Sequence, residues 1–173
     1  YWENERRGMF IDQQDGTLLV NGDAGANGAS WGVFVFSFSS EDHATRVLVP
    51  KSFGGDISVY GTDEGASVAG FELLDDVTVS SRSGSATANS LRVGSLAIES
   101  DNGLVQGNLV TADGVVSARA SNGDISLGSI LADELWTRND NGSTSLADAT
   151  AATLMSVSSQ NGSIDLLRVD APS

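Results

Sequence analysis

The chain has 173 residues, no cysteine and a formal net charge of −14 at pH 7. This acidity argues against nucleic acid and anionic membrane surfaces as partners, because both attract basic protein surfaces. The lack of cysteine excludes a disulfide framework and thiolate metal sites, and no apolar run is long enough to span a membrane.

The first 50 residues are expected to form a lead-in followed by an antiparallel β cap. Residues 1–9 are charged and aromatic without a clear period. The chain begins with Tyr1 rather than Met, which suggests that a signal peptide or an anchor has been removed. Residues 10–50 contain Asp-Gly and Asn-Gly turn signals between short alternating apolar runs, as in antiparallel strands.

Three phenylalanines alternate along one of these predicted strands, at Phe34, Phe36 and Phe38. Alternate residues of a strand share one face. If this face packs against the repeats that follow, it covers strand edges that would otherwise invite aggregation. The alternative is that the same row forms a surface for a partner.

A block of imperfect tandem repeats occupies residues 51–173. Asn-Gly pairs mark the clearest copies, at residues 102, 122, 141 and 161, so successive pairs lie 20, 19 and 20 residues apart. Ser83-Gly84 and Glu64-Gly65 stand in the same place in two weaker copies, each 19 residues before the next. A fixed period of this length is typical of stacked repeat architectures.

Apolar residues fall two apart on either side of each pair, which is the strand period. Asn-Gly favours positive φ and is expected to form the turn between two short strands. If each repeat closes one circuit, equivalent residues stack, as in the column six residues before each asparagine: Leu96, Val116, Leu135 and Met155. We therefore predict an all-β fold, a parallel β-solenoid (single-stranded β-helix) of about 20 residues per coil and about six coils, roughly 29 Å long.

The sequence also resembles the adhesin-like β-strand-repeat family, which is mostly bacterial and mostly uncharacterised. The resemblance covers Arg46 to the end and rests on V-x-x-P, I-x-V and S-x-N-G-x-I-x-L motifs. The matching segments are Val47–Pro50, Ile57–Val59, Ser121–Leu127 and Ser159–Leu166. The resemblance implies the same solenoid fold, and the family name implies adhesion. Two coils depart from the pattern, because Thr137 and Thr144 occupy inward slots and Gly107 leaves one empty.

The turn asparagines are expected to stack as a hydrogen-bonded ladder along one edge of the solenoid. The ladder consists of Asn102, Asn122, Asn141 and Asn161. Aspartates near the same turns leave a row of calcium ions as the alternative, because calcium is bound by several oxygens. These aspartates are Asp101, Asp113, Asp124 and Asp140. The glycine-rich nonapeptide of calcium-binding rolls is absent.

The outward slots of the repeats contain one large aromatic residue. Trp136 lies five residues before Asn141, and an exposed ring there would contact a sugar or a protein. The alternative is that a loop covers the ring. Glu99 and Arg119 occupy outward slots of successive coils, where they are expected to be neighbours able to pair.

No group of residues indicates catalysis. His43 is the only histidine and lies beside Glu41 and Asp42, so histidines alone cannot complete a zinc site. No nucleophile elbow accompanies any serine, and no phosphate loop or dinucleotide motif is present. We therefore predict no catalytic residue, no cofactor and no metal.

The predicted function is that of a non-catalytic structural module, adhesin-like and able to self-associate. Its expected partners are a protein or glycan surface, or further copies of the chain. The acidic composition, with Lys51 as the only lysine, fits an extracellular or cell-surface location. Two alternatives are a structural accessory subunit docked in a larger complex and a polysaccharide-acting β-helix enzyme.

Overall fold

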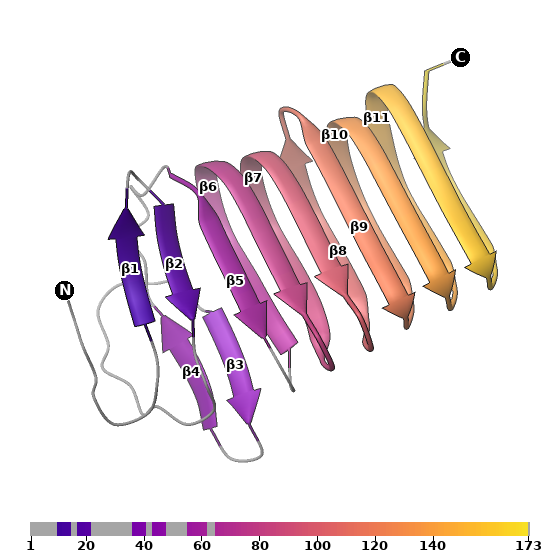
Figure 1. The fold of residues 1–173 in the computed structure, drawn as a ribbon. Coiled ribbons are helices and arrows are strands. Elements are labelled where there is room, and N and C mark those ends of the chain that lie inside the picture. Colours follow the sequence, from indigo (N-terminus) through magenta and orange to yellow (C-terminus); the bar gives the residue numbers. More distant parts are fainter. Residues whose placement is uncertain are drawn as a thin grey trace.

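Successive repeats of the chain form successive turns of a parallel β-solenoid (Figure 1). The structure, a computed structural model, describes residues 10–14, 17–21, 36–40, 43–47, 55–61 and 65–172. These residues form strands and turns, and none of them belongs to a helix that could cross a membrane. The all-β solenoid of about six coils that the repeat period predicts is confirmed.

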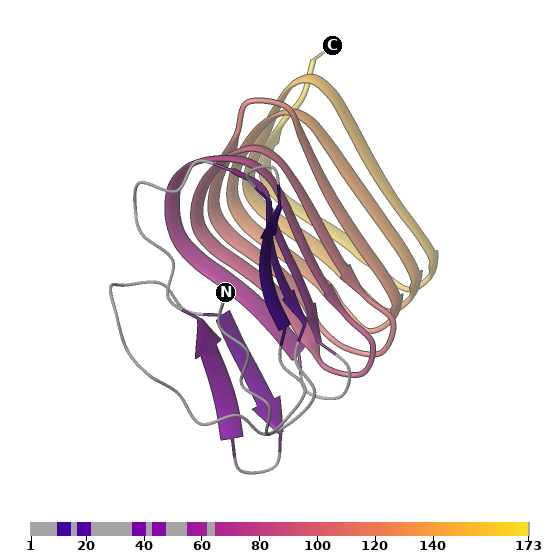
Figure 2. The ribbon, with the colours of Figure 1, turned by 60° about the vertical axis from the view of Figure 1, so that its left-hand side comes forward.

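Two antiparallel strand pairs lie at the N-terminal end. Strand β1 (Phe10–Gln14) pairs with β2 (Thr17–Asn21), and β2 then pairs in parallel with β5 (Ile57–Gly61). Strand β3 (Phe36–Ser40) pairs with β4 (His43–Val47) in a separate two-stranded sheet that lies beside the first coil (Figures 1 and 2). The sheet of the solenoid therefore already includes two strands from the region predicted as a cap.

The capping role of the phenylalanine row stays a prediction. Phe34 lies outside the described residues, and Phe36 and Phe38 are described only by their place in β3, opposite Val47 and Thr45. The predicted division at residue 50 also stays a prediction.

The coils themselves are built from seven strands that pair only in parallel. These are β6 (Gly65–Ser81), β7 (Ser85–Ser100), β8 (Val105–Ala112), β9 (Val115–Asn122), β10 (Ile125–Asn141), β11 (Thr144–Asn161) and β12 (Ile164–Asp170). Strand β7 pairs with both β8 and β9, and both of these pair with β10. The coil between β7 and β10 is therefore made of two shorter strands, whereas each neighbouring coil has one long strand in the same place. Figure 2 shows the coils as flattened loops stacked one behind another.

The inward columns are superposed as predicted. Val77, Leu96, Val116, Leu135 and Met155 pair in register across five strands. The first four are buried and Met155 is half-buried. Each fully buried aliphatic side chain contributes roughly 1.5–3 kcal/mol relative to an exposed one. A single coil leaves one side of this row open, so the contribution depends on stacking.

The register of the first coil differs from the predicted alignment. Gly65 pairs with Ser85 rather than with Gly84, and the offset stays at 20 residues until a bulge between Glu72 and Leu74 shortens it to 19. The extra residue of this coil therefore lies at the bulge. A bulge accommodates one additional residue without moving the flanking inward slots to the other face.

Each coil has a second corner that the Asn-Gly alignment did not predict. One residue per coil adopts left-handed φ there and stacks on its equivalent: Gly70, Ser90, Leu109, Ser129, Asp148 and Arg168. The φ angles of the five non-glycine residues lie between 51° and 54°. This conformation bends the strand and interrupts the alternation of inward and outward side chains. Successive inward positions there are three residues apart instead of two, as from Leu127 to Ile130. That three-residue step was the available sequence signal.

Close backbone approach accounts for the glycine of each Asn-Gly corner, and positive φ angles of 156° at Gly123 and 141° at Gly142 give a second reason at those two positions. The asparagines are not among the residues with positive φ, contrary to the expectation for this turn. A Cβ atom on Gly123 would collide with the carbonyl oxygen of Gly103, and one on Gly142 with that of Gly123. The stacked corners therefore leave no room for a side chain at these positions.

The interior is not uniformly apolar in the coil that contains Asn141. Thr137, Asn139 and Thr144 are buried, and an oxygen of each has no protein partner among the described residues. The inward slot at Gly107 was expected to be empty, but it is filled. Side-chain carbons of Leu127 and neighbouring isoleucines occupy the space that a Cβ would take.

Candidate functional site

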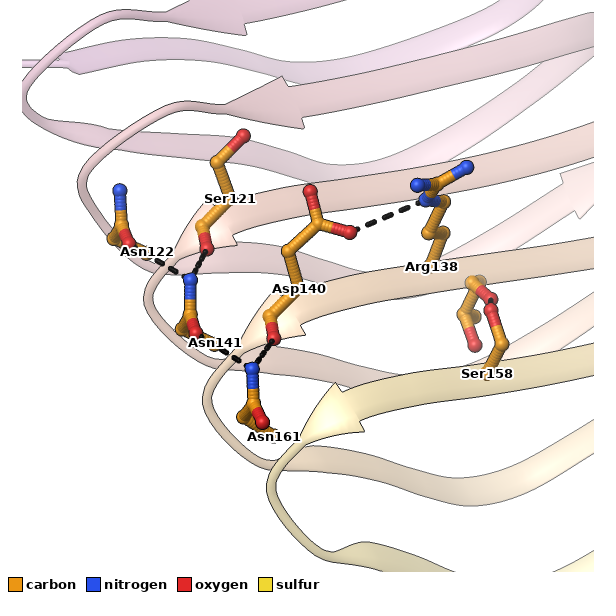
Figure 3. A network of polar contacts seen from close by, with 8 residues as sticks. Ser121, Asn122, Arg138, Asp140, Asn141, Ser158 and Asn161 are labelled. Carbon is orange, nitrogen blue, oxygen red and sulfur yellow. Dashed lines mark hydrogen bonds and ion pairs between the residues drawn. The ribbon is translucent and has the colours of Figure 1, made fainter.

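The turn asparagines form a hydrogen-bonded ladder along one edge (Figure 3). Asn122 Nδ2 donates to Asn102 Oδ1 at 3.0 Å, and Asn141 Nδ2 donates to Asn122 Oδ1 at 3.1 Å. Asn161 Nδ2 donates to Asn141 Oδ1 at 3.1 Å. Each amide thus points in the same direction along the solenoid, and the corners of neighbouring coils are held in register.

The same amides also satisfy backbone carbonyls of the preceding coil. Nδ2 of Asn141 donates to the carbonyl of Ser121 at 3.1 Å, and Nδ2 of Asn161 donates to that of Asp140 at 3.4 Å (Figure 3). At the equivalent corner of an earlier coil, the carbonyl of Arg82 accepts both the Asn102 N–H at 2.9 Å and Asn102 Nδ2 at 3.3 Å, so the side chains add to the backbone hydrogen bonds between coils. The ladder therefore stabilises the stacking of neighbouring coils at this edge without a bound ligand.

The aspartates near these turns make contacts of their own. Asp124 accepts a hydrogen bond from the Ser143 amide at 2.8 Å, and Asp140 lies 3.2 Å from Arg138. Among the described residues, no group of three or more acidic, histidine or cysteine side chains is close enough to hold a metal ion. The calcium row therefore receives no support from the part of the chain that the structure describes.

Trp136 stands on the outward face of β10, with small residues on both sides. Ser117 of β9 and Ser156 of β11 are its partners in register, so neither neighbour covers the ring. The residue is 42% exposed, and its Nε1 donates to Glu134 Oε2 at 2.9 Å. The ring is thus oriented by a hydrogen bond and accessible on a flat strand surface.

Two arginines, in register with each other, lie two residues further along the strands than Trp136 and its partner Ser117. Arg119 of β9 and Arg138 of β10 are cross-strand partners, and Arg138 is held by Asp140. Glu99 of β7 is the neighbour of Arg119 as predicted, but the two side chains form no ion pair in the structure. The outward face around Trp136 therefore combines an aromatic ring with two guanidinium groups on a molecule that is acidic overall.

Among the described residues, no strand covers the outer side of the last coil. Strand β12 pairs only with β11, and the second half of β11 pairs only with β10. Ile164 and Leu166 continue the inward columns of Ile125 and Leu127, yet they are exposed whereas the latter are buried. An unpaired strand edge beside exposed apolar side chains is a template for further pairing.

His43, the single histidine, belongs to β4, where it pairs with Ser40, and its side chain is not described. Asn141 and Asn161 are each followed by Gly-Ser, which makes them formal glycosylation acceptors, and both are members of the ladder.

Comparison with known proteins agrees with the fold. A family model described as Toastrack DUF4097 matches residues 1–172. No curated protein and no solved structure matched the chain. The match is to a β-solenoid-like repeat family of uncharacterised proteins, so it supports the repeat architecture, whereas the adhesin-like label stays a prediction.

Proposed function

Because the chain belongs to the Toastrack DUF4097 family, and because its last described coil is open, we propose that it is a non-catalytic structural module that associates with a second copy of itself. In this proposal the stacked coils form a rigid rod and the open end forms the contact. The acidic, lysine-poor composition supports an extracellular or cell-surface setting, where an adhesin-like role would place it.

The observation that carries the proposal is that side chains in the last described coil are exposed, whereas the equivalent side chains one or two coils earlier are buried in the core. Ile125 and Leu127 are 1% and 2% exposed, whereas Ile164 and Leu166 are 42% and 53% exposed in the same columns. Burying one such side chain is favourable by roughly 1.5–3 kcal/mol. A further layer of strand on this end would therefore stabilise the molecule.

A second copy is a suitable occupant of this end. Residues 151–170 carry Asp165, Asp170 and Arg168 as their only charged residues, so this coil has a net charge of −1 while the whole chain has −14. Charge repulsion between two copies is therefore smaller at this end than their total charge implies. About a two-fold axis, the two open ends would present the same apolar row and the same unpaired edge to each other.

The test is the mass of the chain as a function of concentration, measured by sedimentation equilibrium. We expect a monomer–dimer equilibrium that Leu166→Asp shifts to monomer, because the substitution places a carboxylate in the apolar row. Leu131→Asp is the matched control, because Leu131 is 51% exposed on the side of the solenoid rather than at its end. Circular dichroism would verify that both variants keep their strand content.

The outcomes separate clearly. A strict monomer over the whole concentration range would overturn the proposal. Equal effects of the two substitutions would also overturn it, since they would show that association is not located at the open end. Masses that grow beyond the dimer would indicate that the contact is head-to-tail and forms filaments, because only a two-fold contact closes.

The Trp136 surface supports a second candidate function, the binding of an acidic glycan. An exposed aromatic ring offers a stacking platform for a sugar, and Arg119 and Arg138 offer donors for its carboxylate groups. We expect a glycan array to show binding of uronic-acid-containing glycans that Trp136→Ala abolishes. Leu109→Ala, on a corner away from this surface, should leave binding unchanged. Retained binding in Trp136→Ala would refute this candidate.

A further inference from the structure

One inward column of the solenoid consists of small or polar side chains. It lies two residues before the corner asparagine of each coil, or before the serine that stands in its place. The members, which pair in register from coil to coil, are Ser81, Ser100, Ala120, Asn139 and Ser159. Ala120 is the only one of the five without a polar side chain.

In three coils this side chain donates a hydrogen bond to the carbonyl of the glycine in the preceding corner. These hydrogen bonds run from Ser100 Oγ to Gly84 at 2.9 Å, from Asn139 Nδ2 to Gly123 at 3.0 Å and from Ser159 Oγ to Gly142 at 3.3 Å. The corresponding glycine for Ala120 is Gly103. Ala120 has no side-chain donor, and no group among the described residues donates to the carbonyl oxygen of Gly103.

The next coil contains two buried side-chain oxygens without a partner. Asn139 donates through Nδ2 to the carbonyls of Gly123 and Ser143, at 3.0 and 3.2 Å, and these two acceptors fix the orientation of its amide. No described residue donates to its Oδ1. The buried Oγ1 of Thr137, two residues earlier on the same face of β10, is also without a protein partner among the described residues. Burial of such groups without a hydrogen bond costs free energy.

The side chains that stack against Thr137 and Asn139 in the preceding coil are unusually small. Their register partners there are Ala118 and Ala120. Each alanine is the smallest member of its column, because the column of Ala118 otherwise contains Val79, Ile98, Thr137 and Val157. The two stacked coils thus combine unpaired oxygens with the shortest side chains of both columns.

We propose that this part of the interior is a binding site for one water molecule, which supplies the hydrogen bonds that a serine at position 120 would make. Ser100 and Gly84 show that a polar group beside Ala120 is within reach of the Gly103 carbonyl. Asn139 borders the same space, because adjacent strands lie about 4.8 Å apart and Ala120 is its register partner.

The hydrogen-bonding capacity of water matches these three oxygens. Water donates two hydrogen bonds, to the Gly103 carbonyl and to Asn139 Oδ1, which are both acceptors. It accepts one from the hydroxyl of Thr137. Two residues of a strand span roughly 6.6 Å, a separation that one water between two side-chain oxygens bridges. Three polar partners are typical of a buried water.

The surroundings favour water over a cation and leave Thr144 outside the site. No charged side chain is among the buried residues that the structure describes, so a cation would have no compensating charge. Thr144 stacks between Ile125 and Ile164, which are large and apolar. A water needs room and polar partners, and Thr144 has neither in its own column.

A crystal structure at about 1.5 Å resolution or better tests the site directly. We expect a water oxygen within about 2.6–3.2 Å of both the Gly103 carbonyl and Asn139 Oδ1. In Ala120→Ser this water should be absent, and the introduced hydroxyl should contact the Gly103 carbonyl as Ser100 Oγ contacts Gly84. Ordered side chains without this water in the unsubstituted chain would overturn the proposal, as would a direct hydrogen bond from Thr137 Oγ1 to Asn139 Oδ1.

Urea unfolding tests the role of Thr137 independently. If its hydroxyl binds the water, Thr137→Val should lower the unfolding midpoint more in the unsubstituted chain than in Ala120→Ser, where the water is displaced. Thr144→Val is the matched control and should shift the midpoint equally in both backgrounds. An equal effect of Thr137→Val in the two backgrounds would overturn the proposal. If Ala120→Ser does not fold, the crystal structure of the unsubstituted chain decides alone.

Discussion

Arg168 lies directly over Asp148, and the two side chains form a two-pronged ion pair between the second corners of the last two coils. Nη2 of Arg168 donates to Oδ2 of Asp148 at 2.8 Å, and Nε donates to Oδ1. Both residues have left-handed φ, 51° and 54° respectively. The pair therefore joins the two positions in the terminal coils at which the backbone conformation is least favourable for side chains.

The ion pair predicts a pH dependence. The hydrogen bond from Arg168 lowers the pKa of Asp148 and raises the pKa of Arg168. A carboxyl whose folded pKa is lowered contributes stability above its unfolded pKa and loses it as the pH falls through the folded pKa. NMR titration should show Asp148 titrating below an ordinary aspartate, and Arg168→Ala should return it to the usual range. An unchanged titration in that variant would contradict the assignment.

Relief of left-handed strain should stabilise the solenoid at Leu109. This residue is exposed and has a φ of 53°, a conformation that asparagine tolerates better than leucine does. We expect Leu109→Asn to raise the free energy of unfolding by about 0.5–1 kcal/mol. Leu131→Asn is the control, since Leu131 is equally accessible without left-handed φ. Urea unfolding measures both, and a similar gain in the control would remove the explanation.

The stacked glycines should not tolerate a methyl group. In Gly103→Ala the new Cβ meets the carbonyl of Gly84, so the corners of two coils must separate, and Gly103 is not among the glycines with positive φ that would add backbone strain. We expect a loss of roughly 1–3 kcal/mol, the usual cost of overpacking. Gly128→Ala is the matched control, because its Cβ would meet only a side-chain oxygen of Asn108, at 3.1 Å. Thermal unfolding should separate the two variants by several degrees.

Replacing a buried hydroxyl should stabilise the coil that contains Asn141. Thr144 stacks between Ile125 and Ile164, and its Oγ1 has no protein partner among the described residues. Thr144→Val keeps the shape and removes the desolvation cost, so we expect a gain of about 1 kcal/mol in unfolding free energy. Thr78→Val, in an exposed slot, should have little effect. A loss of stability in Thr144→Val would show that its hydroxyl is hydrogen-bonded in solution.

The sequence predicted the inward columns because the repeats place like residues at nearly constant intervals. Leu96, Val116 and Leu135 could be superposed from spacing alone, since alternation along a strand decides which side chains point inward. It did not predict the left-handed corner. Leucine, serine, aspartate and arginine share that position and have no composition in common.

What the sequence determined by itself was the period, the strand character and the identity of each column, because these depend on local alternation and on a repeated turn signal. Only the tertiary structure decided that the glycines are needed for close stacking, that Trp136 is uncovered, and that Ile164 and Leu166 are exposed. Each of these depends on what lies in the neighbouring coil, and a residue such as Leu166 has the same local pattern as the buried Leu127. Burial in a solenoid is a property of the stack, so it differs between coils whose sequences follow the same rule.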